Sequence, residues 1–346
     1  MTRRMTDPDV RLIVTGFLRR SGLLAPGDAD PALTPLTGGV SSDLWRADLP
    51  FGPVCVKSAL PQLKVARRWL APTSRNRIEY EWLRFAQPLV PGQVPRVLAH
   101  DEQAGLFAME YLPPDQYPVW KTLLLAGQVD VGAARDVGAL AGTLHAASAL
   151  DPAAAATFAT DKNFDALRIE PYLRVTARAH PDLGQRLAGI AERTAGTHLA
   201  VAHGDVSPKN ILLGPHGPVL LDAECAGYGD PAFDVAFCIN HLLIKSVRVP
   251  AAAAALRAAA RALADAHARH VRWEPADHLD SRVASLTPAL ALARVDGSSP
   301  VEYLSPAQRV TVRSAARSLL LEPPATVSEL VDRWAALTLD RKESLR

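Results

Sequence analysis

The sequence predicts an α+β fold in two lobes, in which an antiparallel sheet with a leading helix is followed by a larger helical part. Between residues 36 and 112, short apolar runs alternate with turns that contain glycine or proline, which is the pattern of strands. After residue 131, apolar residues recur at helical spacing over long segments. A chain of 346 residues can bury two separate cores, so we expect one lobe over residues 1–112 and the other over residues 113–346.

Composition and charge indicate which partners and which cellular compartment to expect. Basic and acidic residues nearly balance, with 38 Lys and Arg against 36 Asp and Glu, so nothing points to a nucleic-acid partner. No apolar stretch of about 20 residues lacks charges, and the polar start is unlike a signal peptide, so we expect no membrane partner. The 3 cysteines have no metal-type spacing and suit a reducing cytosol, so we expect a cytoplasmic protein.

The first lobe begins with a helix and a glycine-rich turn. Apolar residues at helical spacing predict an amphipathic helix near residues 9–24. Residues 36–49 then form two short runs around a turn that contains Gly38, Gly39 and Ser41. Because glycine lets backbone N–H groups approach anionic oxygens, this turn is a candidate phosphate-binding hairpin. An ordinary hairpin explains the same residues.

A lysine on the next strand favours phosphate binding. Residues 54–57 are an apolar run that ends in Lys57, directly after the glycine-rich turn. Lysine at such a place is typical of strands that contact nucleotide phosphates. A helix predicted over residues 76–85 carries Glu79 and Glu81, either of which could form an ion pair with Lys57. We expect Glu79 to be the partner and Glu81 to be a surface acid.

Two further strands end the first lobe. Residues 94–100 and 106–112 predict paired strands around a turn at residues 101–105, and two prolines follow. Backbone groups of about Glu110 to Leu112 are candidates for binding the adenine of a nucleotide. An edge strand that ends at prolines is the alternative.

The second lobe is predicted to be mostly helical. The pattern predicts helices over residues 131–149, 182–195, 251–269, 281–294, 306–321 and 326–339. His145 lies on or beside the apolar face of the first of these helices, where we expect a hydrogen-bonded core histidine rather than a catalytic one. No repeat or low-complexity linker interrupts these segments, so we expect a single helical lobe.

The motif His-Gly-Asp-Val-Ser-Pro-Lys-Asn at residues 203–210 carries the chemistry. It places Asp205 and Asn210 five positions apart, and Asp222 follows an apolar run. A phosphoryl-transfer site needs one carboxylate near the attacking hydroxyl and oxygen ligands that hold Mg²⁺ against the nucleotide phosphates. Asp205 is therefore the candidate base, and Asn210 and Asp222 are the candidate metal ligands. Solvated turn acids are the alternative, but Asp205, Asp222 and Glu224 would repel one another if they converged without a cation.

Short apolar runs surround this motif. Residues 199–202, 210–213 and 219–221 form three such runs, separated by glycine and proline. This spacing predicts three strands joined by turns. The second and third would form a hairpin that brings Asn210 and Asp222 to neighbouring positions.

Polar residues after the motif are expected to have structural roles. Asp230 precedes Pro231 and could cap the helix that follows. Asp234 lies among apolar residues, so we expect it to hydrogen-bond the loop of the motif. Cys225 lies close to the motif in sequence, and we expect it to be a small buried residue.

Together these residues resemble the aminoglycoside phosphotransferase and choline kinase superfamily, the small-molecule relatives of the protein kinases. The similarity runs from the glycine-rich turn to about residue 237 and depends on the His-Gly-Asp motif with Asn210 and Asp222. Gly204, at a position where protein kinases usually carry arginine, points to the small-molecule branch. The N-terminal lobe is also similar to methylthioribose kinase, in residues 56–61, 77–81 and 108–112.

The resemblance implies a protein-kinase-like fold that uses Mg²⁺ and ATP, or alternatively GTP. It implies that Asp205 is the catalytic base and that the strand lysine and its glutamate partner hold the nucleotide phosphates. The Mg²⁺ ligands that it implies are Asn210 and Asp222. Glu224 is similar to an extra acid near the metal in some choline-kinase-like members.

The activity implied is transfer of the γ-phosphate of ATP to a hydroxyl of a small metabolite or antibiotic. The C-terminal helices carry basic residues as evidently as acidic ones, which argues against a polycationic acceptor. Arg294 and Asp296 are candidate substrate contacts, although an ordinary helix connector explains them as well. The alternatives are an aminoglycoside or methylthioribose-type sugar kinase and, in a different class, a nucleotide-binding regulator with little transferase activity.

Overall fold

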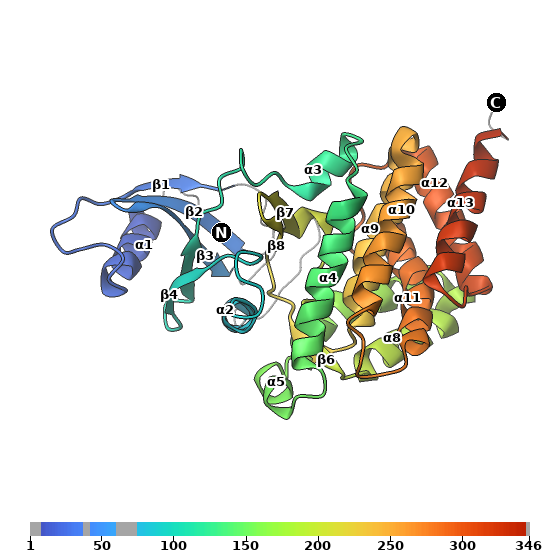
Figure 1. Cartoon of the computed structure of the whole chain (residues 1–346), viewed down its shortest axis with the longest axis horizontal. Coiled ribbons are helices and arrows are strands. Elements are labelled where there is room, and N and C mark those ends of the chain that lie inside the picture. Colours follow the sequence, from blue (N-terminus) through green and yellow to red (C-terminus); the bar gives the residue numbers. More distant parts are fainter. Residues whose placement is uncertain (1–7, 37–41, 60–74, 344–346) are drawn as a thin grey trace. The chain divides into compact units, whose positions relative to one another are not determined.

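The computed structural model describes residues 8–36, 42–59 and 75–343. The chain divides into two compact units, Met1–Pro113 and Pro114–Arg346. The first, which we call the sheet unit, contains a five-stranded sheet, and the second, the helical unit, is built mostly of helices (Figure 1). Within the described ranges, no helix combines the length and the apolar character that crossing a lipid bilayer requires.

The sheet unit is built on one antiparallel sheet with the strand order β1-β2-β3-β5-β4. Its strands are β1 (Ala32–Pro35), β2 (Ser42–Leu49), β3 (Gly52–Ala59), β4 (Val97–Asp101) and β5 (Leu106–Glu110). Strands β1 and β2 pair on either side of the glycine-rich turn, as predicted, but β1 ends at Pro35, before the first run expected from residue 36. The turn residues Gly38, Gly39 and Ser41 lie outside the described residues.

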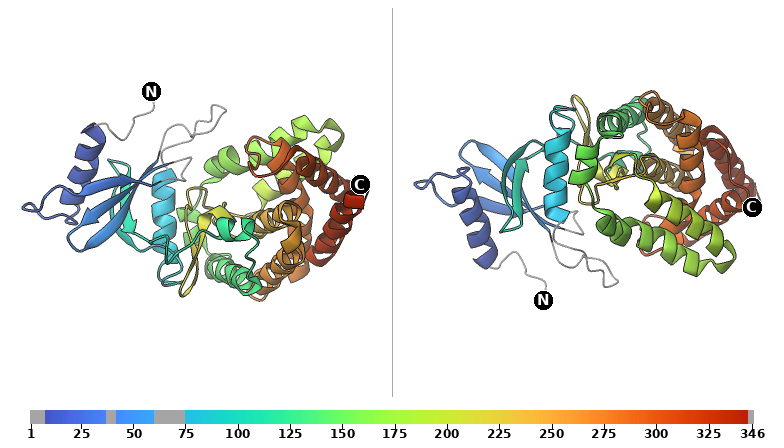
Figure 2. Two further views of the ribbon diagram at one scale, coloured as in Figure 1. Left: turned by 90° about the horizontal axis from the view of Figure 1, so that it is seen from above. Right: turned by 90° about the horizontal axis from the view of Figure 1, so that it is seen from below.

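Two helices cover opposite faces of this sheet (Figure 2). The first, α1 (Pro8–Arg20), forms a core with apolar side chains of β2, β3 and β5, among them Trp45 and Val56. Because successive side chains of a strand point to opposite faces, Lys57 points away from that core. It points toward the second helix, α2 (Arg75–Ala86), as its contact with this helix shows.

The helical unit contains a group of packed helices. Its α-helices are α3 (Trp120–Leu125), α4 (Val131–Ser148), α5 (Pro152–Thr157), α6 (Asp161–Phe164), α7 (Val175–Ala179), α8 (Gly184–Gly196), α9 (Ala232–Arg248), α10 (Ala253–Ala268), α11 (Ala276–Asp296), α12 (Pro306–Leu321) and α13 (Val327–Glu343). In this group α10 packs against both α4 and α9, and α9 packs against α11 (Figure 1). The contact of α4 with α10 is close because Gly138 has no side chain; a Cβ there would lie 2.1 Å from the carbonyl oxygen of Leu263.

The helical unit also contains two small antiparallel ladders of two strands each. One pairs β6 (Ala200–Ala202) with β9 (Gly227–Gly229). The other pairs β7 (Ile211–Gly214) with β8 (Gly217–Leu220), which confirms the predicted hairpin. The loop between β6 and β7 therefore contains the His-Gly-Asp motif.

The pattern predicted most helices but not all of their bounds. The helix expected over residues 281–294 is α11, which begins five residues earlier because the periodic pattern does not mark its first turn. Residues 161–179, to which the pattern assigned no element, form a continuous helical stretch made of α6, the π-helical segment η1 (Asp165–Arg174) and α7. Pro171 lies inside η1 and has no N–H to donate, which accounts for irregular hydrogen bonding there.

Candidate active site

In the sheet unit, Lys57 and Glu79 form a buried ion pair. The Nζ atom of Lys57 lies 2.7 Å from Oε2 and 2.8 Å from Oε1 of Glu79. The two side chains are only 4% and 2% exposed. The predicted choice of Glu79 over Glu81 is therefore confirmed, and Glu81 forms no ion pair with the described part of the chain.

The other nucleotide-site candidates of this unit lie at the end of β5. The N–H of Glu110 donates to the carbonyl oxygen of Arg96, at 2.9 Å, so it is already used. Leu112, two residues later, is partly buried, and its N–H makes no hydrogen bond within the ranges that the structure describes. The N–H of Leu112 is therefore available to a ligand, whereas that of Glu110 is not.

In the helical unit, Asp234 holds the loop of the His-Gly-Asp motif. Its Oδ2 accepts the N–H of His203 at 2.6 Å, and its Oδ1 accepts the N–H of Gly204 at 2.8 Å. The Nε2 atom of His145 lies 3.1 Å from Oδ2, and its Nδ1 lies 2.8 Å from Nε2 of His267. The expected roles are confirmed: Asp234 binds the loop, and His145 is a buried, hydrogen-bonded core histidine.

The loop turns at Gly204, which has a φ of +76°. This left-handed region favours glycine, and a Cβ would lie 2.6 Å from the carbonyl oxygen of Cys225. Cys225 is buried as expected, and burial raises the pKa of its thiol. Beyond the turn, the N–H of Asp205 donates to Nδ1 of His203 at 3.2 Å. Burial lowers the pKa of His203, so this nitrogen keeps the lone pair that accepts the bond.

The carboxylate of Asp205 has two oxygens in different surroundings. Oδ2 lies 2.8 Å from Nη2 of Arg168 and 2.9 Å from Nζ of Lys209. Oδ1 is buried and has no hydrogen-bond partner in the described part of the helical unit. Burial acts to raise the pKa of Asp205, but the charges of Lys209 and Arg168 outweigh it, and the pKa lies below its ordinary value. The side chain is therefore an ionised carboxylate with one oxygen available to a hydrogen-bond donor.

The β7–β8 hairpin brings Asn210 and Asp222 to the same end of the ladder, since the N–H of Leu221 donates to the carbonyl oxygen of Asn210 at 2.9 Å. The Nδ2 group of Asn210 donates to the carbonyl oxygen of Asp205 at 3.2 Å, and its Oδ1 accepts a hydrogen bond from Nζ of Lys209 at 3.3 Å. Asp222 has a φ of +68°, a conformation that a non-glycine residue adopts at a cost. Glu224, two residues after Asp222, is buried.

These side chains fit a hard cation such as Mg²⁺. Amide and carboxylate oxygens are its preferred ligands, and the Nδ2 bond of Asn210 orients its Oδ1, which contacts Lys209 and no backbone group that the structure describes. Among the described residues, no group of three or more His, Cys, Asp and Glu side chains has metal-binding geometry. A Mg²⁺ ion would therefore need the amide, solvent and phosphate oxygens in addition to the carboxylates.

Arg168 is a residue of this site that the sequence analysis missed. It lies on η1, and besides its ion pair with Asp205 it donates from Nε to the carbonyl oxygen of Gly204. Its guanidinium group lies 5.7 Å from the ring centre of Tyr172 and 5.6 Å from that of Phe237. No local pattern around residue 168 marks it, whereas Lys209 could have been found from its place four positions after Asp205.

The two candidate substrate contacts, Arg294 and Asp296, have different partners. Asp296 lies 2.6 Å from Arg313 and 2.9 Å from His180, so it joins structural elements instead of facing a substrate. Arg294 is buried and donates to the hydroxyl of Tyr172 at 3.2 Å. Asp230 accepts the N–H of Ala232 at 3.0 Å, which confirms its capping role. The carboxylate of Asp230 also binds Arg282.

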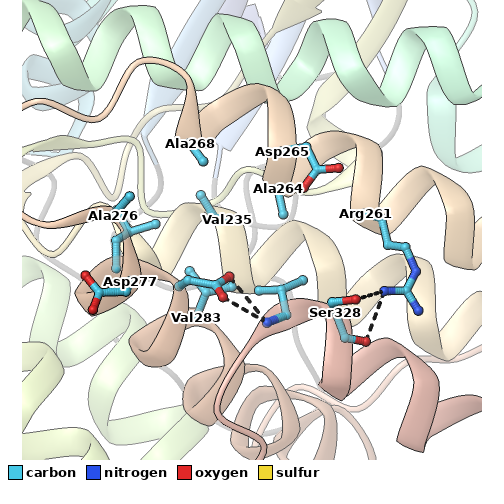
Figure 3. Close-up of a pocket in the computed structure, with 12 residues that line it drawn as sticks. Val235, Arg261, Ala264, Asp265, Ala268, Ala276, Asp277, Val283 and Ser328 are labelled. Atoms are coloured by element: carbon cyan, nitrogen blue, oxygen red, sulfur yellow. Dashed lines mark hydrogen bonds between the residues drawn. The ribbon is translucent and has the colours of Figure 1, made fainter.

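A separate cavity of about 340 Å³ lies among α9, α10, α11 and the start of α13 (Figure 3). Its polar side chains are partly used, because Arg261 donates to Ser328 and Asp280 accepts the N–H of Val327. None of the predicted site residues lines this cavity.

The sheet unit with its buried Lys-Glu pair and the helical unit with its His-Gly-Asp loop together define the class of kinase-like proteins with two lobes. Solved structures support this fold. An amicoumacin kinase, in complex with AMP-PNP, Ca²⁺ and Ami, matches with a TM-score of 0.55 at 13% identity, covering 93% of this chain and 98% of its own. A choline/ethanolamine kinase family protein from Mesorhizobium loti matches with a TM-score of 0.52 at 18% identity, covering 96% and 100%.

The chain belongs to the phosphotransferase enzyme family, whose family model matches residues 32–251. The predicted resemblance and the predicted fold class are both confirmed.

Curated relatives are similar at low identity. A methylthioribose kinase of Pectobacterium atrosepticum is 28% identical over 233 residues, which are 60% of this chain and 58% of that protein. Methylthioribose kinase 2 of Oryza sativa subsp. japonica is 24% identical over 269 residues, which are 66% and 62%. The chain thus spans about three fifths of the length of these relatives.

Proposed function

We propose that this protein is a Mg²⁺- and ATP-dependent kinase that phosphorylates a hydroxyl of a small molecule in the cytoplasm. The observation that carries the proposal is the carboxylate of Asp205. One of its oxygens is fixed by Arg168 and Lys209, and the other is buried and has no hydrogen-bond partner among the described residues. A general base in phosphoryl transfer needs such an oxygen, held in place and open to the hydroxyl of the acceptor.

In the proposed reaction, Asp205 accepts the proton of the acceptor hydroxyl. The acceptor hydroxyl donates a hydrogen bond to Oδ1 of Asp205, and its oxygen attacks the γ-phosphorus. The bond from the γ-phosphorus to the bridging oxygen breaks, ADP keeps the bonding electrons, and the hydroxyl proton passes to Asp205. Catalysis is then mainly positioning, to which the contacts of Oδ2 contribute.

Residues 1–112 would bind the nucleotide, and residues 113–346 would supply catalysis and the acceptor site. In the sheet unit, Lys57 held by Glu79 would bind nucleotide phosphates, while Gly38, Gly39 and Ser41 would cover them. Backbone groups of Glu110 to Leu112 would bind adenine, chiefly the unused N–H of Leu112.

In the helical unit, Asn210, Asp222 and Glu224 would hold Mg²⁺. The ion, when bound, neutralises charge on the phosphates. The oxygen chemistry of these three side chains supports this assignment.

Sugar phosphorylation of the methylthioribose type is a second candidate. The similarity to methylthioribose kinases over 60% and 66% of this chain favours it. The test therefore includes 5-methylthioribose, an aminoglycoside and choline among the acceptors.

Asp205→Asn tests the assignment because it keeps the shape of the side chain and removes the base. We expect ADP release with the best acceptor to fall roughly 100- to 10,000-fold, while binding of Mg²⁺-ATP changes little. Asp136→Asn, which changes an exposed acid on α4, serves as the matched control and keeps wild-type turnover. Full turnover in Asp205→Asn would refute the role of Asp205. Tight ATP binding with no transfer to any acceptor in the wild type would instead favour a nucleotide-binding regulator.

A further inference from the structure

The helical unit contains a buried group of basic side chains that the mechanism does not use. We call His241, Lys245 and Arg294 the basic cluster; the first two lie on α9 and the third on α11, two helices that pack against each other (Figure 1). These residues are 5%, 1% and 7% exposed. Buried basic groups normally have a carboxylate partner, since burial of an unpaired charge is costly.

No carboxylate of the described residues lies within ion-pair distance of Lys245 or Arg294. The Nζ atom of Lys245 lies 3.4 Å from the carbonyl oxygen of His241 and 3.5 Å from the hydroxyl of Tyr303, both long for hydrogen bonds. The charge of Glu302 acts on Lys245, but this acid already pairs with Lys121.

Nitrogen atoms of the cluster also lack hydrogen-bond partners. Both ring nitrogens of His241 and the Nε of Arg294 are buried and have no hydrogen-bond partner in the described chain. The Nη1 group of Arg294 donates to the hydroxyl of Tyr172 and to Ser299, all neutral acceptors. An anion would supply an acceptor for the Nε–H of Arg294 and for the one N–H of a neutral His241.

The pKa values of Lys245 and His241 are both lowered, as expected for buried basic groups without an anion. Burial, together with the charges of Lys121 and Arg294, lowers the pKa of Lys245 to about 7, although Glu302 acts in the opposite direction. Burial and the charge of Lys245 lower the pKa of His241 well below its ordinary value. The cluster thus carries less positive charge than its residues could, and an entering anion would restore it.

The cluster is connected to the proposed catalytic base through two aromatic rings. Arg168, which contacts Asp205, and Arg294 each lie 5.7 Å from the ring centre of Tyr172. Arg168 also lies 5.6 Å from the ring centre of Phe237, and this ring lies 5.4 Å from that of His241. Tyr303, which is partly exposed, lies with its ring centre 5.2 Å from Nζ of Lys245.

We infer that the acceptor substrate carries an anionic group, a carboxylate or a phosphate, in addition to the hydroxyl that is phosphorylated, and that this group binds the basic cluster. The inference rests on the proposed kinase function and names its class of acceptor. Cationic acceptors such as choline or an aminoglycoside would place an ammonium group beside Lys245 and Arg294, which like charges disfavour. The phosphoryl-transfer step itself is unchanged, with the proton passing to Asp205.

Matched pairs of acceptors test the inference with the full-length protein and Mg²⁺-ATP. The pairs are ribose and ribose 5-phosphate, and glycerol and glycerate, with 5-methylthioribose and choline as further neutral and cationic compounds. We expect kcat/KM, from ADP release, to be at least tenfold higher for an anionic member than for its neutral partner. The phosphate and carboxylate pairs distinguish the two sources of charge. Equal or better use of the neutral or cationic compounds overturns the inference and leaves the kinase function standing.

Two variants connect the effect to the cluster. Lys245→Met and Arg294→Met should each raise KM for the anionic acceptor at least tenfold, with less than a twofold change for a neutral one. Arg248→Met, which removes an exposed cation from the same helix, is the control and should change neither value. Lys245→Arg, which keeps the charge, should restore part of the affinity. Unchanged KM in both cluster variants overturns the inference.

Calorimetric titration of the same anionic compounds without ATP separates the two proposals. Saturable binding that Lys245→Met weakens tenfold, in a protein that transfers no phosphate to any acceptor, supports the anion site and counts against the kinase function. Absence of binding by every anionic compound overturns the inference. Because the methionine removes an unpaired buried charge, we expect this variant to fold at least as well as the wild type, so a loss of fold would also count against it.

Discussion

Replacement of Asp234 by asparagine would exchange one carboxylate oxygen for an NH₂ group at the point where the catalytic loop is attached. The carboxylate, which is 0% exposed, accepts the N–H groups of His203 and Gly204 and contacts His145. Whichever way the amide turns, its NH₂ group faces at least one backbone N–H. One charge-assisted hydrogen bond is therefore lost, and one buried donor remains unpaired.

The magnitude follows from these two effects. A hydrogen bond to a charged group contributes about 1.5–3 kcal/mol, and a buried unpaired donor costs about 1–3 kcal/mol. Because the two effects overlap at one N–H, we expect the free energy that opens the loop to fall by about 3 kcal/mol. A change of this size corresponds to roughly 100-fold faster exchange of the loop amides.

Hydrogen exchange measured by mass spectrometry on peptides that cover residues 199–210 checks this expectation. Asp230→Asn is a matched control, because Asp230 is another buried carboxylate just before α9 but binds Arg282 instead of the loop. The control should cost stability and leave exchange of the loop within about threefold of wild type. Equal exchange of the loop peptides in Asp234→Asn and wild type would refute the anchoring role of Asp234.

Three further changes have defined outcomes. Gly204→Ala should lower the free energy of unfolding by at least about 2 kcal/mol, because a side chain is strained at this φ and meets a carbonyl oxygen; equal stability in urea denaturation would contradict it. Glu79→Ala leaves Lys57 buried without its carboxylate and should cost roughly 3–5 kcal/mol and raise KM for Mg²⁺-ATP, whereas Glu81→Ala should change little in either assay. The lowered pKa of Lys245, about 7, means that above this pH the unfolded chain holds more protons than the folded one. The free energy of unfolding should therefore rise between pH 7 and about 10, by at most about 1.4 kcal/mol per pH unit. In urea titrations Lys245→Met should abolish this rise. An unchanged slope in the variant would exclude Lys245 as its cause.

Local sequence was sufficient for much of the sheet unit and for the loop of the motif. Lys57 and Glu79 could be matched because a strand and an amphipathic helix have fixed periodicities, so the inward positions of each can be read from spacing. The attachment of the loop by Asp234 was predictable for a similar reason. A carboxylate among apolar residues on a buried helix requires donors, and the nearby loop supplies backbone N–H groups.

Contacts between distant elements could not be predicted in this way. Arg168 reaches Asp205 only because an irregular helix packs beside the loop, and neither the irregularity nor the packing is marked near residue 168. Arg294 and Asp296 show the same limit, since two positions in one turn of α11, two residues apart, have different partners. Hydrophobic periodicity identifies the buried face of a helix but not the helix against which that face packs.

Helix α9 bears the loop anchor Asp234 in its first turn and Lys245 in its last, 11 positions later on nearly the same side. At 1.5 Å per residue this separation is about 16 Å along the axis. The helix therefore fixes the distance between the attachment point of the catalytic loop and the charge proposed to bind the acceptor. Insertion of one residue between them would rotate Lys245 by about 100° away from that side, so the register of one helix would select acceptors by length as well as by charge.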